Sequence, residues 1–299
     1  MGVSKRRRRL LTPISDFNTG NSAEPVVFSK ELGKMGIRGI DAVNMEPVNK
    51  IRILKVFVSS LTKLDLIEKV VKWSQQAQER SILYANAHTL NLAYRDLTFL
   101  STLNAVDLVF ADGISVVWAA RFLYHERLEK LVCRVWVELF LARAAEEKIK
   151  IFILAGKPGV AETAAQVLQV KIPNLNVVGT HTGYFQPEEI AGLIQAINET
   201  RPQVVFIGMG SPFQELWLAK YREQISAPVC CAVGAYFDYH AGLEKSVPEW
   251  INRLGLEWFW RLILDPHGKW RRYVLGNPLF IFRVLEQKFM SKTWRSVKH

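Results

Sequence analysis

Cysteine is scarce in this chain of 299 residues, which has only Cys133, Cys230 and Cys231. Two of the three are adjacent and none belongs to a C-x-x-C pair, which argues against a disulfide framework and against a thiolate metal site. We therefore expect a reducing, cytoplasmic setting. The sequence also lacks any Asp-x-Asp pair. We thus expect no metal site in which paired carboxylates bridge a metal ion to a nucleotide diphosphate.

Long hydrophobic runs and familiar catalytic signatures are absent too. No run approaches the roughly 18 apolar residues of a membrane-spanning helix, and the basic start is not followed by the apolar stretch of a secretory signal. There is neither G-x-S-x-G nor H-E-x-x-H. GKPGVAET at 156–163 fails the spacing of a phosphate-binding loop, and GMGSPF at 208–213 has Phe213 where a dinucleotide fingerprint has its third glycine. Both segments fit ordinary strand-to-helix turns, although such glycines would also bring backbone N–H groups to a diphosphate.

The net charge of +11 is concentrated at the two ends of the chain. Positions 5–9 are all basic, and positions 261–299 hold nine Lys and Arg against two acidic residues. The residues between these ends are close to neutral. A nucleic-acid-binding protein usually spreads its basic residues over one folded face, so we expect no nucleic-acid partner. Basic ends on a neutral body fit an anionic membrane surface.

The chain divides into three parts by composition. Residues 1–45 are basic and then rich in Ser, Asn, Gly and Pro, which predicts a flexible tail; residues 46–255 form a domain, and residues 256–299 a basic, aromatic appendage. In the domain, apolar strands alternate with helical periodicity, which indicates an α/β fold with a Rossmann-like parallel sheet and helices on both faces. The expected strands are 51–58, 81–87, 106–111, 149–156, 175–185, 203–210 and 228–238, and the expected helices include 61–78, 88–104, 159–170 and 187–199.

Ligands bind such sheets at the carboxyl ends of the strands. Several expected strands end in small or polar residues that should line one crevice: Asn86, Asp112-Gly113, Ala155-Gly156, Gly208-Met209-Gly210 and Gly234. Asp112 is unusual, because a carboxylate between an apolar strand and an apolar helix is costly to bury without partners. It either caps the helix that follows or acts as a general base at the mouth of a pocket.

Residues 250–285 mix Trp, Phe and Leu with Arg and Lys over segments too short to span a membrane. Such a stretch favours an anchor that lies in the membrane interface. The alternative is a helical layer packed on the domain.

The chain resembles the WecG/TagA/CpsF glycosyltransferase family over roughly residues 50–275, in six ordered blocks: NAHTLNLAYRDLTFLSTLNAVDLVFADGISVVWAARFL, FILAGKPGVAETAA, GTHTGYF, VVFIGMGSPFQELWL, AVGAYFDYHAG and GLEWFWRLILDPHGKWRRY. The resemblance implies an inverting enzyme that moves an N-acetylmannosamine-type sugar, or a related hexose, from a UDP donor to a polyprenyl-diphosphate-linked acceptor in surface polysaccharide biosynthesis. It implies a peripheral position on the inner face of the plasma membrane, with an appendage that docks there and helps complete the site. It implies no cofactor besides the UDP-sugar substrate. The oligomeric state is left open, a homo-oligomer included.

The resemblance also assigns site residues. Asp112, in the Asp-Gly pair with Gly113, matches the proposed general base, and Asn86 matches an asparagine at a strand end. Gln214 and Glu215 match a pair expected near the nucleotide, although they could simply open a helix. The appendage arginines would meet the diphosphate, although singly each also fits a surface or lipid-headgroup contact. The candidate substrate-binding residues are therefore Asn86, Gly113, Gly156, Gly208, Gly210, Gln214, Glu215, Arg261, Arg271 and Arg272.

Three departures from the family pattern fall near expected substrate contacts. Tyr84 stands where the family commonly has Thr, Ser246 replaces an arginine, and Glu138 is the candidate substitute for a missing Gly-x-Asp. They bear on sugar identity and on whether activity is retained. Two other functions stay open: a nucleotide-dependent oxidoreductase that uses Gly208 and Gly210, and a non-catalytic membrane-associated module of the same fold.

Overall fold

A computed structural model gives the fold of residues 48–243, 250–251 and 256–296. The expected tail at 1–45 and the departure at Ser246 lie outside these described residues. The core is a six-stranded sheet with strand order β4-β3-β8-β7-β5-β6, in which every neighbouring pair is parallel. Its strands are β3 (Arg80–Ala85), β4 (Leu108–Ala111), β5 (Ile151–Ala155), β6 (Val177–His181), β7 (Val204–Gly208) and β8 (Val229–Ala232).

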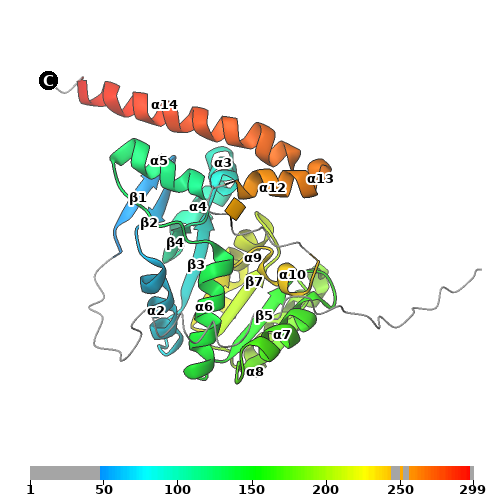
Figure 1. Ribbon diagram of the computed structural model, residues 1–299. Coiled ribbons are helices and arrows are strands. Elements are labelled where there is room, and N and C mark those ends of the chain that lie inside the picture. Colours follow the sequence, from blue (N-terminus) through cyan, green and yellow to red (C-terminus); the bar gives the residue numbers. More distant parts are fainter. Residues whose placement is uncertain (1–47, 244–249, 252–255, 297–299) are drawn as a thin grey trace, which may run out of the picture. The chain divides into compact units, whose positions relative to one another are not determined.

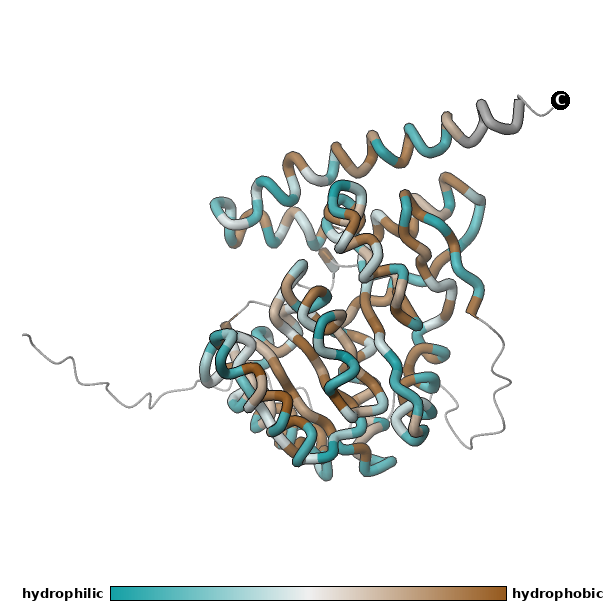
Figure 2. The backbone as a smooth tube through the Cα atoms, turned by 180° about the vertical axis from the view of Figure 1, so that it is seen from behind, coloured by the Kyte–Doolittle hydropathy of each residue, from teal (hydrophilic) through white to brown (hydrophobic). Residues whose placement is uncertain are grey.

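Helices cover both faces of the sheet (Figure 1), which confirms the predicted α/β alternation. Most strands are apolar segments in the interior (Figure 2) because a parallel sheet covered on both sides has no face in water; the edge strand β6 is half-buried. The helices are α2 (Lys63–Ser74), α3 (Ala87–Arg95), α4 (Leu97–Ala105), α5 (Ile114–Tyr124), α6 (Cys133–Glu146), α7 (Val160–Lys171), α8 (Ile190–Thr200), α9 (Phe213–Tyr221) and α10 (Tyr236–His240), with 3₁₀ turns at Pro187–Glu189 and Arg222–Gln224.

Four predicted elements are wrong in their extent, and one of them is the strand expected at 175–185, which is only β6 (Val177–His181). The single strand expected at 51–58 is a hairpin of β1 (Lys50–Ile53) and β2 (Val56–Ser59), because Leu54 turns the chain with a φ of 54°. The helix expected at 88–104 is two helices, since Asp96 ends α3 and caps α4 by accepting from Thr98 N and Phe99 N. The strand expected at 228–238 ends at Ala232, and residues 236–240 form α10.

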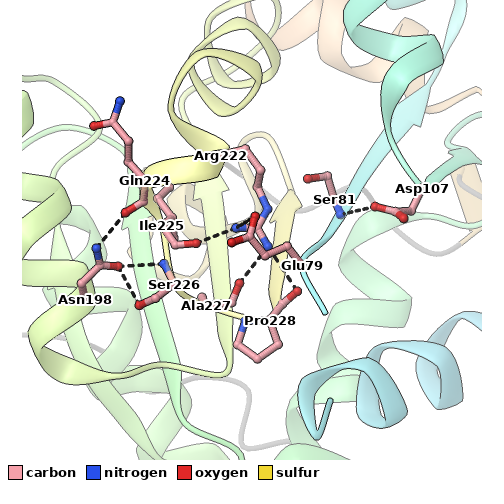
Figure 3. Close-up of polar contacts among 10 residues, drawn as sticks. All are labelled: Glu79, Ser81, Asp107, Asn198, Arg222, Gln224, Ile225, Ser226, Ala227 and Pro228. Atoms are coloured by element: carbon pink, nitrogen blue, oxygen red, sulfur yellow. Dashed lines mark hydrogen bonds and ion pairs between the residues drawn. The ribbon is translucent and has the colours of Figure 1, made fainter. Parts of the chain in front are cut away.

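The amino ends of β8 and β3 are fixed by a polar network centred on Arg222 (Figure 3). Its guanidinium donates to the carbonyls of Ile225, Ala227 and Pro228 at 2.7, 2.8 and 3.3 Å and pairs with Glu79 at 3.6 Å. These bonds satisfy backbone oxygens in the turn that leads into β8. The network stabilises the end of the sheet at which β8 and β3 begin. Ligands of such sheets bind at the opposite end, where the strands finish.

The appendage folds as α12 (Glu257–Leu264), α13 (Pro266–Trp270), a π-helical turn (Arg271–Leu275) and α14 (Gly276–Ser296). Helix α14 lies across α3 and α5 (Figure 1). Polar contacts hold it there: Asn91 Nδ2 donates to Gly276 O at 2.7 Å, and Arg283 Nη1 donates to Asn91 Oδ1 at 2.7 Å. The appendage is therefore a packed helical layer. No helix among the described residues is long and apolar enough to cross a membrane.

Candidate active site

A cavity of about 840 Å³ opens at the carboxyl ends of β3, β4 and β8. In the sheet, β3 lies between β4 and β8. β4 follows β3 directly in the chain, whereas β8 is the last strand of the sheet and pairs with the other side of β3. This reversal of strand order is where open α/β sheets bind ligands. The strand ends contribute Asn86, Asp112 and Gly234 to the cavity wall, and the appendage contributes Arg261 and Arg272. The structure thus brings part of the predicted crevice together with part of the appendage.

Asp112 follows β4 directly and lines the cavity, half-buried. Its backbone N–H donates to Ala85 O at 2.8 Å, which extends the β3–β4 pairing by one residue. Its Oδ1 accepts from Cys133 N at 3.4 Å. Helix α5 has Gly113, with a φ of 124°, at its N-cap and no side-chain capping bond. The interpretation of Asp112 as the cap of α5 is therefore wrong, because its carboxylate accepts from the first residue of α6 and not from α5.

The electrostatic surroundings of Asp112 favour its protonated form. Burial and then the negative charge of Glu257 raise the pKa of the Asp112 carboxyl from 3.8 to about 6, while Arg261 and Arg272 partly offset this rise. A carboxyl with this pKa is ionised at neutral pH yet is a stronger base than an ordinary aspartate. It is therefore suited to accept a proton.

Asn86 both caps helix α3 and lines the cavity. Its Oδ1 accepts from His88 N at 3.0 Å and from Thr89 N at 3.1 Å. The helix thus occupies the amide oxygen, while the amide NH₂, which makes no hydrogen bond within the described part of the chain, is available to donate to a ligand. His88 lines the same wall, and burial followed by the charge of Arg272 lowers the pKa of its ring to about 4. It is accordingly neutral at pH 7.

The appendage brings two arginines to the cavity. Arg261 pairs with Glu257 at 2.6 Å, one helical turn away, and its guanidinium lies 5.5 Å from the ring centroid of Tyr239. Arg272 also lines the cavity, although it is exposed. Arg271 does not: it is exposed and lies over the ring of Trp270. Of the three predicted arginines, two therefore reach the site.

Gln214 and Glu215 lie behind the cavity wall, fully buried at the start of α9. Gln214 Nε2 donates to Tyr84 Oη at 3.0 Å, and Gln214 Oε1 accepts from Gly234 N at 3.1 Å. Glu215 Oε1 accepts from Ser211 Oγ at 2.5 Å. The pair thus holds Tyr84, Ser211 and Gly234, which do line the cavity. Their place is supporting, and burial raises the pKa of the Glu215 carboxyl.

The predicted glycines separate into two groups. Gly210 lines the cavity; its φ is 75°, and no atom lies within 4 Å of the position that a Cβ would take. Gly156 and Gly208 do not line it. A Cβ on Gly156 would lie 2.3 Å from Val160 Cγ1, and one on Gly208 would lie 2.6 Å from Gly234 O. Both positions need glycine for close packing at strand ends, which explains these two glycines without a ligand.

Two departures from the family pattern lie in different surroundings. Tyr84 lines the cavity, and its hydroxyl lies 3.3 Å from Ser211 Oγ. Glu138 lies on α6 away from the cavity lining. Burial raises the pKa of its carboxyl, and nearby Lys171 and Arg134 oppose that rise. The structure therefore does not bring Glu138 to the site.

Sequence reasoning missed several cavity residues, among them Glu257, Tyr239, Lys130 and Arg134. Glu257 had a detectable signal, because it stands four residues before Arg261 at helical ion-pair spacing. The others come from loops and helices whose relation to the strand ends no local pattern reveals. Among the described residues, no group of three or more His, Cys, Asp or Glu side chains could hold a metal ion.

The structure is an α/β fold with a cavity that is lined by a carboxylate of raised pKa and by two arginines. This arrangement suits proton transfer on an anionic substrate. The chain belongs to the WecG/TagA/CpsF family of glycosyltransferases, whose description "Glycosyl transferase WecG/TagA/CpsF family" it matches over residues 51–293. A relative from Bacillus subtilis (strain 168) is 31% identical over 239 residues, or 79% of this chain and 90% of the relative. One from Staphylococcus aureus (strain NCTC 8325 / PS 47) is 27% identical over 243 residues, or 80% and 93%. Both are named N-acetylglucosaminyldiphosphoundecaprenol N-acetyl-beta-D-mannosaminyltransferase.

Proposed function

We propose that this glycosyltransferase moves an N-acetylmannosamine-type sugar, or a related hexose, from a UDP donor to a polyprenyl-diphosphate-linked acceptor, with inversion, in surface polysaccharide biosynthesis. The names of the two relatives, which specify an N-acetylmannosaminyl group and a diphosphoundecaprenol-linked acceptor, support this substrate class. We further propose that it works peripherally on the inner face of the plasma membrane. The donor nucleotide and the acceptor lipid are its substrates, and no further cofactor enters the proposal.

The position and basicity of Asp112 carry the proposal. In an inverting transfer, the acceptor hydroxyl attacks the anomeric carbon from the face opposite the leaving group and must lose its proton as it does so. Asp112 lies at a strand end in the cavity with a pKa of about 6. Its carboxylate accepts the hydroxyl proton while the bond from the sugar to the diphosphate breaks. The wild-type rate should accordingly rise with pH through about 6, as the carboxyl ionises.

The departing nucleotide diphosphate takes up negative charge, which must be balanced as the glycosidic bond breaks. Arg272 and Arg261 are the cavity arginines that the appendage supplies, and guanidinium groups bond phosphate oxygens in bidentate fashion. In the structure Arg261 is paired with Glu257, so Arg272 has the more available charge. We assign Arg272 the main role in binding the diphosphate.

The outer side of the appendage supports the proposed membrane position. Large apolar side chains there are exposed to solvent: Phe259, Ile263, Leu275, Phe282, Phe289 and Met290. They accompany the basic residues of the same segment, a combination that binds anionic lipid interfaces.

Replacing Asp112 with Asn tests the proposal. The expected result is loss of transfer by at least 100-fold with a UDP-sugar and a short-chain lipid-diphosphate acceptor, because an amide cannot accept the proton. UDP binding, measured by calorimetry, should stay within threefold of the wild type. Retained turnover would remove Asp112 from the chemical role. If the wild-type protein transferred no sugar from any UDP donor, the non-catalytic alternative would replace the proposal.

The oxidoreductase alternative finds no support. Family membership places the chain among glycosyltransferases, and the close approach of Gly208 to Gly234 O is accounted for by packing. A thermal-shift comparison of UDP with NAD would show stabilisation by UDP alone.

A further inference from the structure

The cavity that contains Asp112 continues outward as a slot between α5 and α14. Its α5 wall includes Ile114, Trp118 and Phe122, which are spaced four residues apart and therefore share one helix face. Its α14 wall is made of Phe280, Ile281, Val284 and Leu285. The inner end of the same cavity is polar, with a carboxylate and two arginines. The cavity thus changes from charged to apolar along its length.

The apolar end is open to solvent. Trp118, Phe122, Ile281 and Leu285 line the cavity and yet are 63%, 45%, 58% and 39% exposed. Exposed apolar surface of this extent is unusual in a protein without a ligand or partner for it. The mouth of the slot therefore suits an apolar ligand that enters from outside.

Polar contacts attach α14 to α5 and to α3. Lys288 Nζ donates to the carbonyls of Phe122 and Leu123 at 2.6 and 2.8 Å, in the last turn of α5. Nearer the start of α14, Arg283 Nη1 bonds to Asn91 on α3. Helix α14 thus bridges α5 and α3 through hydrogen bonds. The facing apolar side chains of α5 and α14 do not pack fully against each other, since several of them stay exposed.

We propose that this slot binds the first isoprene units of the acceptor's polyprenyl chain. The inference rests on the proposed function and deepens it. A ligand with an anionic head and an apolar tail matches the change along the cavity: its diphosphate lies toward the arginines and its tail runs between the helices. A peptide would leave backbone N–H and C=O groups unpaired against these walls. From Ile114 to Phe122 the slot runs about 12 Å along α5, so the rest of a long chain lies in the bilayer.

Equilibrium binding of isoprenyl diphosphates tests this without requiring turnover. Isopentenyl, geranyl and farnesyl diphosphate share one head and differ only in tail length. They are titrated into the full-length protein by calorimetry, without lipid and below the concentrations at which they form micelles. Each buried methylene contributes roughly fourfold in affinity at most. We expect farnesyl diphosphate to bind at least tenfold more tightly than isopentenyl diphosphate.

Adjacent residues on α14 provide a matched control. Ile281 lines the slot, whereas Phe282 is similarly exposed but does not. Ile281→Ser should remove most of the advantage of farnesyl over isopentenyl diphosphate and leave isopentenyl diphosphate binding unchanged. Phe282→Ser should leave the tail-length dependence intact. Trp118→Ser repeats the test from the α5 wall, and unchanged melting temperatures confirm that each variant is folded.

Two results would overturn the inference. One is an affinity that does not change with tail length in the wild type. The other is an equal loss in the Ile281 and Phe282 variants, which would indicate general adhesion of lipid to the surface. Neither result would contradict the proposed sugar transfer, provided that Asp112→Asn loses transfer as expected. Conversely, if affinity rose with tail length but the wild type transferred no sugar, the slot would still be a binding site for an isoprenyl tail and the proposed function would be refuted.

Discussion

Asp112 combines a proposed chemical role with a cost to stability. Its folded-state pKa of about 6 exceeds the ordinary 3.8, so the folded protein binds the proton more tightly than the unfolded chain does. The favourable contribution of the protonated form is fully present below about pH 3.8 and is lost as the pH rises through about 6. Above that pH, the ionised carboxylate destabilises the folded state.

Asp112→Asn should therefore stabilise the folded protein at pH 8 while it abolishes transfer. The pKa shift sets an upper limit of about 3 kcal/mol, and partial contact with solvent reduces the expected gain to about 1–2 kcal/mol. Thermal unfolding from pH 4 to pH 8 measures it. The difference between variant and wild type should vanish toward pH 4. A variant less stable than the wild type at pH 8 would show that the carboxylate is well compensated in the fold.

Arg271 and Arg272 allow a comparison of neighbours with equal charge. Both are exposed, but only Arg272 lines the cavity. Arg272→Gln should weaken UDP binding at least tenfold, because a charge-assisted bond to phosphate is worth about 1.5–3 kcal/mol. Arg271→Gln should change binding less than twofold. Calorimetry at two salt concentrations separates contact from general attraction, and equal losses in both variants would contradict the assignment.

At the scale of elements, α14 depends on polar contacts with α3. Arg283 is only 7% exposed, donates to Asn91 O at 3.1 Å and Asn91 Oδ1 at 2.7 Å, and lies 4.2 Å from the ring centroid of Tyr94. Removal of its guanidinium leaves buried acceptors on α3 without their donor, a loss of about 1–3 kcal/mol.

Arg283→Met should accordingly loosen α14. Hydrogen–deuterium exchange should become faster in α14 and the π-helical turn while the sheet keeps its protection, because local opening follows local stability. Arg95→Met is the control and should not speed exchange in α14: Arg95 is exposed at the end of α3, and its positive charge repels that of Arg283 and lowers the pKa of the Arg283 guanidinium. Unchanged exchange in the Arg283 variant would show that the apolar contacts of α14 suffice.

The same scale separates what the sequence predicted from what it did not. Strands buried on both faces have a continuous apolar pattern, so β4, β5, β7 and β8 and most of β3 were predictable, whereas β6 at the sheet edge is half-buried and less apolar. Asp112 and Asn86 were predictable because each follows a strand closely. The break at Leu54 depends on the φ of one residue and the break at Asp96 on the capping bonds of one side chain, and hydropathy registers neither. Asp96 nevertheless fits the N-cap preference, so this break had a local signal.

Long-range packing explains the remaining differences. Gln214 and Glu215 sit at a helix start, as a ligand-binding pair would, but tertiary contacts direct both inward to Tyr84 and Ser211. Likewise, neighbouring residues on a helical turn point in different directions, and Arg272 lines the cavity whereas Arg271 lies over the ring of Trp270. No periodicity in the sequence distinguishes these two residues.

At the scale of the whole molecule, charge and apolar exposure coincide on the appendage, which also supplies half of the cavity's charged groups. The proposed membrane attachment and three charged residues of the cavity lining therefore fall on one segment. Deleting residues 256–299 should reduce both association with anionic vesicles and turnover, since Arg261 and Arg272 are lost together with the exposed apolar side chains. Vesicle pelleting and a transfer assay measure the two effects, and full activity with normal pelleting would contradict both roles.

A double variant separates these two roles. Phe282 and Phe289 are 63% and 62% exposed and lie outside the cavity lining. Phe282→Ser with Phe289→Ser should weaken binding to anionic vesicles about tenfold or more, because each Phe contributes about 1.5–3 kcal/mol when fully buried in an apolar phase and part of that in an interface. Turnover of a water-soluble acceptor should stay within twofold. Val170→Ser, at an 84% exposed site on α7, controls for general surface polarity. Loss of soluble-acceptor turnover in the double variant would mean that the outer face of α14 also shapes the site.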